Sequence, residues 1–237
     1  MNIIVIGATS GIGKALFEKY VKEENRLGII GRRTQLLDEL KHQYPSKTHT
    51  ATADITKQDE VEQAISSLQK KLGSIDLAFV CSGMGDLNPS LDYNVERPTI
   101  DTNVIGWTFV VDMLYNLFEQ QGHGHLVAIT SAGGLRGEPM APAYSATKAY
   151  QINYMEALRK KAYKAGGKIT VTDVRPGLVD TAMAKGEGLF WVMPVEKVAR
   201  QIYTAIRNKN SKIYVTKRWH LLAAINKNLP FKLYKRM

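Results

Sequence analysis

Three side chains in the middle of the sequence have the types and spacing needed for proton transfer to a carbonyl oxygen. Tyr144 and Lys148 are four residues apart in a predicted helix, so they share one helix face. A phenol with a pKa near ~10 is a poor acid or base at neutral pH, but a neighbouring ammonium lowers that pKa. Ser131 ends a predicted strand and can donate a hydrogen bond to the same oxygen. Alternatively, the Tyr–Lys spacing is an ordinary surface pair on a helix.

A glycine-rich turn follows the first apolar run of the chain and precedes a helical pattern. Positions without side chains let the backbone turn tightly and approach a pyrophosphate, and the following helix offers free N–H groups and a favourable dipole. The other reading is a plain tight turn between a strand and a helix. The residues that we expect to contact a dinucleotide here are Gly7, Thr9, Ser10, Gly11, Ile12 and Gly13.

The next apolar run predicts which dinucleotide binds. Sites for NAD usually carry Asp or Glu at the end of this strand, where the carboxylate bonds the ribose 2′-hydroxyl. Here Gly31 is followed by Arg32 and Arg33, and arginine pairs well with a 2′-phosphate, which favours NADP(H). Two ordinary arginines at a solvated helix start are the alternative. Asp54 and Ile55 follow the third run, where the carboxylate either meets the adenine amino group or caps a helix.

The candidate proton-transfer and dinucleotide-binding residues follow short apolar runs, which alternate with amphipathic stretches along the chain. Near-continuous apolar runs are typical of strands buried on both faces, and their alternation with helices predicts a parallel sheet. We therefore expect an α/β fold with a doubly wound parallel sheet of about seven strands flanked by helices. The long irregular stretch 178–194 is expected to be a functional or mobile loop.

The formal charge of +10 over 237 residues is unevenly distributed. No Asp or Glu follows Glu196, whereas eleven Lys and Arg do, so residues 1–196 carry 21 basic against 22 acidic groups. Residues 1–196 are therefore near neutral, and we predict a catalytic domain over residues 1–216 with a basic amphipathic extension of it over residues 217–237.

Composition excludes several classes of protein. The single cysteine, Cys81, excludes a disulfide framework, and no apolar run approaches the ~20 residues needed to span a bilayer. The first apolar run begins at Asn2 without a basic segment before it, so we expect a cytoplasmic protein without a signal peptide. We predict no metal site.

In combination, these motifs resemble those of the short-chain dehydrogenase/reductase family over about residues 2–216. The resemblance implies a Rossmann-type fold and an NADPH-dependent oxidoreductase that reduces a ketone or aldehyde, or oxidises the matching alcohol. It implies that Tyr144 is the acid/base, that Lys148 binds the nicotinamide ribose and tunes Tyr144, and that Ser131 orients the carbonyl. Asn103 matches a helical asparagine that holds a water in the proton relay of the family.

The resemblance also implies further contacts with the coenzyme, and the sequence departs from the family at two of these places. The segment after the sixth strand is similar to one that lies along the nicotinamide, which implies Pro176, Gly177, Val179 and Thr181. Ser82 and Gly83 are expected beside the ribose, although Val80 and Cys81 stand where the family has two asparagines. Ile6 replaces the threonine that usually opens the glycine motif.

In the family, the substrate meets residues that follow the fourth, fifth and sixth strands. The residues at these places are mostly apolar and rich in methionine, which suits a hydrophobic or lipid-like substrate. The alternative is that several of them pack the loop against the core. They are Met84, Leu135, Arg136, Met140, Met183, Phe190, Trp191 and Met193.

The extension after Thr216 mixes cations with Trp219, Leu221, Ile225 and Phe231, a pattern that suits peripheral contact with an anionic membrane. Docking on the same chain or on a partner subunit is the alternative. The broad apolar faces of the predicted helices 99–120 and 143–165 correspond to dimer interfaces in the family, so we expect a homodimer or homotetramer. A non-catalytic NADP(H)-binding regulatory protein remains the alternative function, whereas no nucleic-acid-binding motif accompanies the basic extension.

Overall fold

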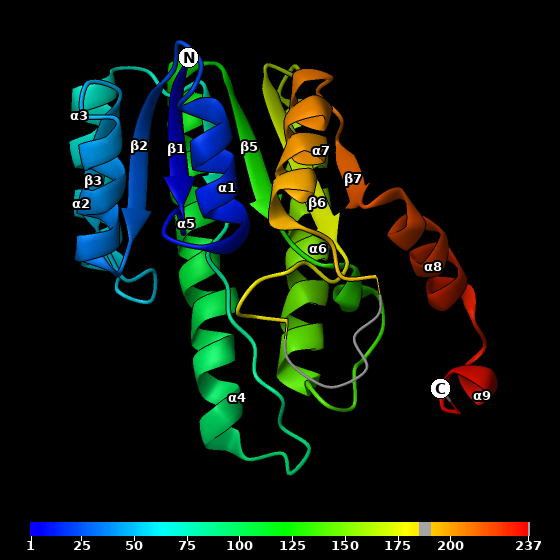
Figure 1. The fold of residues 1–237 in the computed structure, drawn as a ribbon. Coiled ribbons are helices and arrows are strands. Elements are labelled where there is room, and N and C mark those ends of the chain that lie inside the picture. The colour runs from blue at the N-terminus through cyan, green and yellow to red at the C-terminus, as the bar shows by residue number, and fades with distance from the viewer. Residues whose placement is uncertain (185–190, 237) are drawn as a thin grey trace.

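The computed structural model describes residues 1–184 and 191–236. In this part of the chain, seven parallel strands form one sheet in the order β3-β2-β1-β4-β5-β6-β7 (Figure 1), which confirms the predicted fold class. The strands are β1 Asn2–Ile6, β2 Arg26–Gly31, β3 Thr48–Thr52, β4 Leu77–Val80, β5 Gly124–Ile129, β6 Ile169–Pro176 and β7 Lys212–Val215.

Helices connect the strands and continue beyond the last of them. The helices are α1 Gly11–Tyr20, α2 Thr34–Gln43, α3 Gln58–Leu72, α4 Tyr93–Ile100, α5 Trp107–Gln121, α6 Pro142–Lys164, α7 Val195–Arg207, α8 Lys217–Asn228 and α9 Phe231–Tyr234. A π-helical segment, Asp101–Gly106, joins α4 to α5, and a 3-10 turn, Ala132–Leu135, follows β5. No helix in these described ranges has the length and apolar character needed to cross a bilayer.

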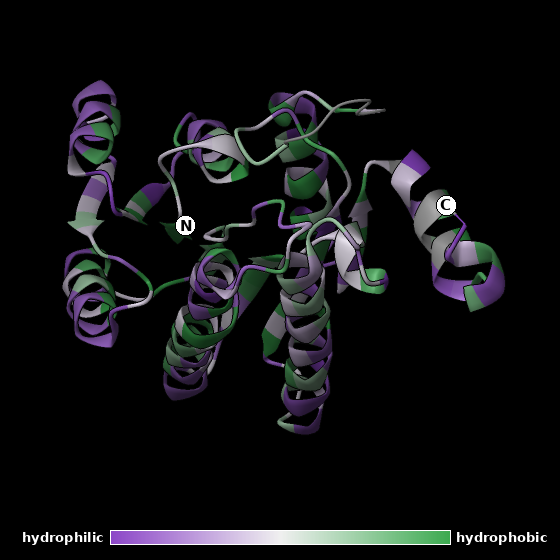
Figure 2. Ribbon diagram, turned by 90° about the horizontal axis from the view of Figure 1, so that it is seen from below, coloured by the Kyte–Doolittle hydropathy of each residue, from purple (hydrophilic) through white to green (hydrophobic). Residues whose placement is uncertain are grey.

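The sheet is covered on both faces because its strands are apolar on both faces. Along β1, Ile4 and Ile6 pack into one core cluster with α3, α5 and α6, whereas Ile3 and Val5 pack into a second cluster with α1, α2 and α7. Figure 2 looks onto the carboxyl edge of the sheet and shows helices on either side of it. Both core layers therefore hold this edge rigidly, and the loops that leave it can form a site.

The helical region before α5 begins earlier than the sequence pattern predicts. We expected one helix over residues 99–120, but α4 starts at Tyr93 and contains Pro98. The carboxylate of Asp92 accepts a hydrogen bond from the Asn94 amide (2.8 Å) and caps the helix start. The π-helical segment that follows includes Asn103 and Gly106, and a Cβ on Gly106 would lie 2.4 Å from the Ile55 carbonyl oxygen. Gly106 thus allows this helix to approach the sheet edge closely.

Candidate active site

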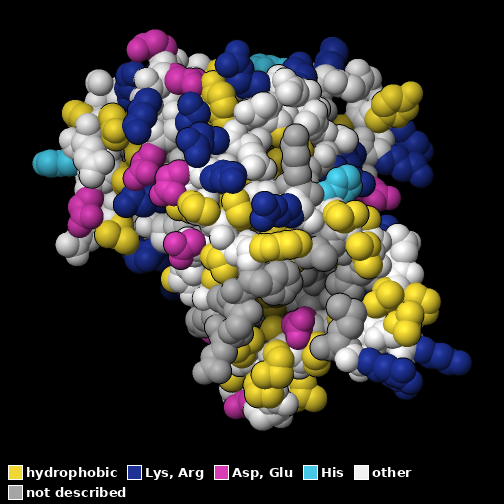
Figure 3. Space-filling view, turned by 45° about the vertical axis from the view of Figure 1, so that its right-hand side comes forward, with side chains coloured by type: hydrophobic (Ala, Val, Ile, Leu, Met, Phe, Trp, Pro, Cys, Tyr) yellow, Lys and Arg dark blue, Asp and Glu magenta, His cyan; other side chains and the backbone are white. Residues whose placement is uncertain are grey.

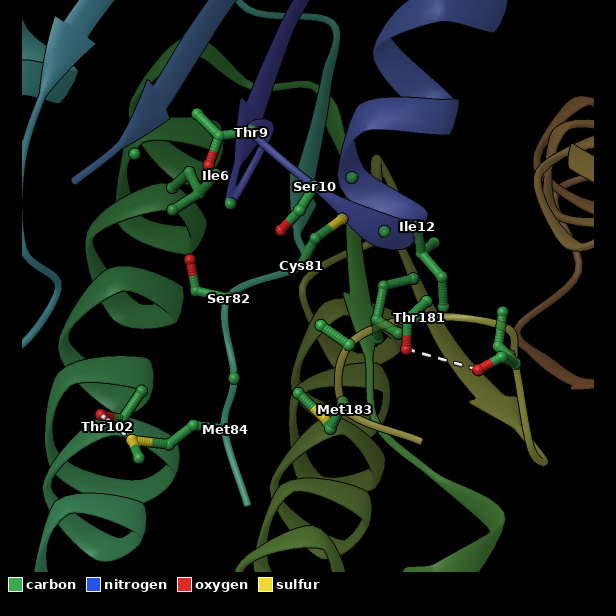
Figure 4. Close-up of a pocket in the computed structure, with 18 of the residues that line it drawn as sticks. Ile6, Thr9, Ser10, Ile12, Cys81, Ser82, Met84, Thr102, Thr181 and Met183 are labelled. Atoms are coloured by element: carbon green, nitrogen blue, oxygen red, sulfur yellow. Dashed lines mark hydrogen bonds between the residues drawn. The ribbon is translucent and has the colours of Figure 1, made fainter. Parts of the chain in front are cut away.

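A cavity of ≈ 440 Å³ lies at the carboxyl edge of the sheet, and most of the predicted site residues line it. Figure 4 shows Thr9, Ser10 and Ile12 of the glycine turn near Cys81 and Ser82, with Thr181 and Met183 on the segment after β6. Of the residues predicted from the sequence, those that line the cavity are Gly7, Thr9, Ser10, Gly11, Ile12, Gly13, Arg32, Arg33, Asp54, Ile55, Ser82, Gly83, Met84, Ser131, Tyr144, Lys148, Pro176, Gly177, Val179, Thr181 and Met183.

Tyr144 lies in the first turns of α6, which begins at Pro142, and its ring faces the segment after β4. A Cβ on Gly85 would lie 2.3 Å from the Tyr144 ring. Only glycine at this position therefore leaves room for the Tyr144 ring. Ser131 follows the end of β5 by two residues, and its Oγ accepts a hydrogen bond from the Gly133 amide (3.0 Å). Ser131 and Tyr144 therefore meet at one end of the cavity, as the spacing predicted.

The net shift of the Tyr144 pKa is upward, opposite to the direction that the helix spacing predicts. Burial of the phenol raises the pKa of Tyr144, and a hydrogen bond with Ser131 acts in the opposite direction. The Lys148 Nζ is 5.9 Å from the centroid of the Tyr144 ring. The sequence argument considered only the helix spacing, whereas the loss of solvation of the phenol is the larger effect.

The Lys148 side chain is only 3% exposed, and its ammonium is held by two acceptors. The Nζ atom donates to the Ile129 carbonyl oxygen (3.2 Å) and to Oε1 of Gln151 (2.9 Å). Burial lowers the pKa of Lys148 to about 8, although the charges of Asp173 and Cys81 work against this. Lys148 therefore changes its charge near physiological pH, which is unusual for a lysine.

Asn103 does not line the cavity but is buried behind it. Its Nδ2 donates to the Met84 carbonyl oxygen (2.7 Å) and to Oγ1 of Thr147 (3.1 Å), and its Oδ1 accepts from the Met84 amide (3.0 Å). The Asn103 backbone carbonyl oxygen accepts a hydrogen bond from Nε2 of Gln151 (2.8 Å). The side chain of Asn103 thus fixes the segment after β4, and its backbone faces the Lys148 side of the site.

The glycine turn has the conformation that a close approach to phosphates needs. Gly7 and Gly11 have φ angles of +85° and +52°, where L side chains are strained. A Cβ on Gly13 would lie 2.1 Å from the Gly7 carbonyl oxygen. The first turn of α1 has no acidic residue, and the Ser10 side chain does not cap it. The backbone N–H groups at this helix start are therefore suited to hold a pyrophosphate.

The two arginines after β2 line the cavity beside the glycine turn. Arg33 donates from Nη2 to Oγ1 of Thr9 (2.6 Å) and to Oγ of Ser10 (2.8 Å), which holds its guanidinium over the glycine turn. Arg32 reaches the Asp54 carboxylate at 3.5 Å. Asp54 is thus paired with Arg32, whereas the residue at the end of β2, Gly31, carries no carboxylate. These residues fit the adenosine end of a dinucleotide, with the Arg33 guanidinium held beside the glycine turn.

Asp54 is fixed by local hydrogen bonds, so it has a structural role beside any contact with adenine. Burial acts to raise the pKa of Asp54, but the backbone and side-chain hydrogen bonds from Thr56 and the charge of Arg32 together lower it. Its Oδ1 accepts from the Thr56 amide at 3.0 Å and from the Thr56 hydroxyl at 2.9 Å. Asp54 is therefore a stable anion that orients the start of the next loop.

The predicted substrate residues divide into two groups. Met84 and Met183 line the cavity, whereas Leu135, Met140 and Trp191 do not, and Phe190 lies outside the described residues. Trp191 has the Arg218 guanidinium 5.7 Å from its ring centroid, and the backbones of Val179 and Met193 pair in a short parallel bridge. The alternative that several of these residues pack the loop against the core thus accounts for Met193, whereas Trp191 is 45% exposed.

The C-terminal extension packs against the segments that border the cavity. A Cβ on Gly177 would lie 2.1 Å from the Trp219 indole, so this ring sits directly over the strand exit after β6. Nη1 of Arg136 donates to the Leu229 carbonyl oxygen (3.1 Å), and the Tyr234 hydroxyl donates to the Gly137 carbonyl oxygen. The extension, residues 217–236, therefore packs against its own domain and contacts the loops after β5 and β6.

Comparisons with known proteins agree with this geometry. The family model described as short chain dehydrogenase matches residues 1–189. An uncharacterized oxidoreductase of Staphylococcus epidermidis is 30% identical over 185 residues, which cover 77% of this chain and 80% of the relative. An uncharacterized oxidoreductase of Mycobacterium tuberculosis is 32% identical over 190 residues, covering 77% and 74% of the two chains.

Two solved structures share the fold over nearly the whole chain. A short-chain dehydrogenase/reductase from Burkholderia phymatum in complex with NAD has a TM-score of 0.86 at 18% identity, covering 95% of this chain and 92% of that one. A short-chain dehydrogenase from Burkholderia cenocepacia in complex with NADP has a TM-score of 0.85 at 20% identity, covering 99% and 96%.

Proposed function

This chain belongs to the short-chain dehydrogenase/reductase family and is an NAD(P)-dependent oxidoreductase; on that premise we propose that it reduces a hydrophobic ketone or aldehyde with NADPH. One observation carries the proposal. A single cavity is lined by Ser131, Tyr144 and Lys148, which lie after β5 and on α6, by the glycine turn after β1, and by Arg33 after β2, and β1 lies between β2 and β5 in the sheet. A regulatory protein that only senses the dinucleotide would need the glycine turn and the arginine but not the proton-transfer groups.

When bound, the dihydronicotinamide supplies the hydride. The chain itself supplies orientation and a proton. Ser131 and Tyr144 bind the carbonyl oxygen of the substrate, and the phenol of Tyr144 donates its proton to that oxygen. The ammonium of Lys148 stabilises the phenolate that remains on Tyr144. In the oxidation direction, Tyr144 accepts the proton of the alcohol instead.

The preference for NADPH over NADH rests on the end of the cavity that holds the arginines. Arg33 is already oriented by Thr9 and Ser10, so little side-chain freedom is lost when it pairs with a phosphate. Gly31 provides no carboxylate for a ribose 2′-hydroxyl. Charge-assisted bonds to a 2′-phosphate are therefore the interaction that this end of the site favours.

The hydrophobic character of the substrate rests on the thioether side chains of Met84 and Met183 in the cavity wall. Met side chains adapt to irregular apolar shapes. In an NADPH-consumption assay over ketones and aldehydes graded by chain length, we expect kcat/KM to rise by about 3- to 4-fold per added methylene until the cavity is filled. Higher kcat/KM for small polar ketones than for long-chain ones would contradict this substrate class.

We also propose that the outer face of the C-terminal extension binds an anionic lipid surface. The inner side of the extension is occupied by its contacts with Arg136, Gly137 and Gly177, but Leu221, Ile225, Phe231 and Leu233 are 52–71% exposed. The surrounding cations are not balanced by any acidic residue after Glu196. Figure 3 shows hydrophobic and basic side chains close together on this part of the surface. Apolar area and positive charge together favour an anionic bilayer.

Vesicle sedimentation tests this surface without removing the extension, whose Trp219 covers Gly177. The variant Phe231→Ser/Leu233→Ser/Lys232→Glu/Lys235→Glu should lose sedimentation with phosphatidylserine-containing vesicles, and wild type should not sediment with phosphatidylcholine alone. Lys160→Glu/Lys164→Glu on α6 is the control, because it changes the charge of the protein equally at exposed positions. Equal sedimentation of wild type and the quadruple variant would overturn the proposal.

A further inference from the structure

A glutamine that the sequence analysis did not single out links the two sides of the proton-transfer site. Gln151 is on α6, one turn after Lys148, and its side chain is completely buried. Its Oε1 accepts a hydrogen bond from Nζ of Lys148 (2.9 Å), and its Nε2 donates to the backbone carbonyl oxygen of Asn103 (2.8 Å). The carboxamide therefore bridges α6 and the π-helical segment, with both of its ends paired.

The burial of a polar side chain at this position calls for a specific role. Burying an amide costs free energy unless its donors and acceptors are paired, and an apolar residue of similar size would fill the space between two helices at lower cost. In the described part of α6, the other buried side chains facing the core include Met155 and Leu158, which make no such bonds. What distinguishes Gln151 from these residues is its contact with the Lys148 ammonium.

The geometry around Lys148 defines what the glutamine does. An ammonium group has three donors, and two of them are taken by the Ile129 carbonyl oxygen and by Gln151. Two acceptors from different elements fix the direction of the remaining N–H group on a long, flexible side chain. Because Lys148 lines the cavity, this remaining donor is available to a ligand there.

We propose that Gln151 is a positioning residue, which holds the Lys148 ammonium in place and couples it to the backbone of Asn103. Its consequence for catalysis rests on the proposed function, in which Lys148 stabilises the Tyr144 phenolate. Gln151 does not line the cavity, and its hydrogen bonds go to Lys148 and Asn103, not to Tyr144. Any effect of Gln151 on catalysis is therefore exerted through Lys148.

The charge state of Lys148 provides a measurable signature of this contact. The charged or titratable groups facing Lys148 are Asp173 on β6, which pairs with Arg175 at 2.7 Å, Cys81 after β4, and Tyr144 on the same helix. Burial lowers the pKa of Lys148 to about 8, and an acceptor on Nζ favours the charged form. Loss of the Gln151 acceptor should therefore lower this pKa further, whereas a carboxylate at the same place should raise it.

Two variants of nearly equal size separate positioning from simple packing. Gln151→Met removes the acceptor, and Gln151→Glu keeps an acceptor oxygen and adds a negative charge. The Lys148 titration can be followed by NMR of ¹⁵N-labelled lysine side chains, with Lys148→Met to assign the signal. We expect a shift of about one pH unit downward in Gln151→Met and of at least about one unit upward in Gln151→Glu.

The pH profile of NADPH oxidation provides the second readout. In wild type, activity should fall as pH rises through about 8, because Lys148 loses its charge there. The pH at which activity falls should be lower in Gln151→Met and higher in Gln151→Glu. Gln121→Met is the matched control, since Gln121 bonds only backbone groups of Ile75 and His123 at the opposite edge of the sheet. Its profile should equal that of wild type.

The outcomes separate this inference from the proposed function. If the Lys148 signal titrates as in wild type in both variants, or shifts in the same direction in both, the positioning role is wrong. If the signal shifts as expected but no carbonyl is reduced, the reductase proposal fails and the Gln151 contact stands. If thermal unfolding shows that Gln151→Met does not fold, the test rests on Gln151→Glu alone: an upward shift of the Lys148 pKa supports the positioning role, and no shift contradicts it.

Discussion

The variant Tyr144→Phe is expected to reduce kcat/KM for carbonyl reduction by about 1,000-fold. The substitution removes only the hydroxyl that donates the proton, and the phenyl ring can still pack against Gly85. The affinity for NADPH should be retained, because the glycine turn and Arg33 bind the other end of the coenzyme. Steady-state rates with the best carbonyl, together with NADPH fluorescence titration, measure the two effects separately.

Tyr163→Phe is the matched control for this loss of activity. Tyr163 lies on the same helix, α6, but its side chain is 84% exposed, so removal of its hydroxyl should leave both rate and affinity unchanged. If Tyr144→Phe retained the activity of wild type, another group would have to donate the proton and the assignment of Tyr144 would be wrong.

The variant Arg33→Ala is expected to lower kcat/KM with NADPH by about 100-fold and to leave kcat/KM with NADH unchanged. The Arg33 guanidinium bonds Thr9 and Ser10, and Arg33 follows β2, which β1 and β4 separate from β5 in the sheet. Loss of charge-assisted bonds to a 2′-phosphate affects only the coenzyme that carries this phosphate. Parallel assays with the two coenzymes at one carbonyl concentration measure the selectivity.

Arg26→Ala controls for the loss of an exposed arginine from the strand that precedes Arg33. Arg26 begins β2 and donates to the backbone carbonyl oxygens of Lys71 and Leu72, at the edge of the sheet remote from the cavity. It should not change the ratio between NADPH and NADH. An equal loss with both coenzymes in Arg33→Ala would mean that Arg33 supports the glycine turn and does not select the 2′-phosphate.

The sequence was sufficient to predict the sheet and the coenzyme side of the cavity, because both depend on local patterns. Apolar runs such as Arg26–Gly31 coincide with strands, and the glycines of the first turn meet steric requirements that no other residue satisfies. The preference for NADP(H) that Gly31, Arg32 and Arg33 indicate stays a prediction.

Features that depend on contacts between distant segments were missed. The bridge made by Gln151 requires β5, α6 and the π-helical segment to meet, although a polar residue on the buried face of a predicted helix is a signal that could have identified it. The direction of the Tyr144 pKa depends on burial, which the helix spacing does not report. The start of α4 was missed because Pro98 lies inside the helix, which begins at Tyr93 after the capping residue Asp92.

Hydride transfer itself can be followed with NADPH that carries deuterium at the hydride-donating carbon of the nicotinamide ring. After incubation with a long-chain carbonyl, mass spectrometry of the product should find one deuterium on the carbinol carbon with wild type and almost none with Tyr144→Phe. Binding of NADPH without deuterium in the alcohol for any ketone or aldehyde tested would contradict the central claim that this protein is a carbonyl reductase.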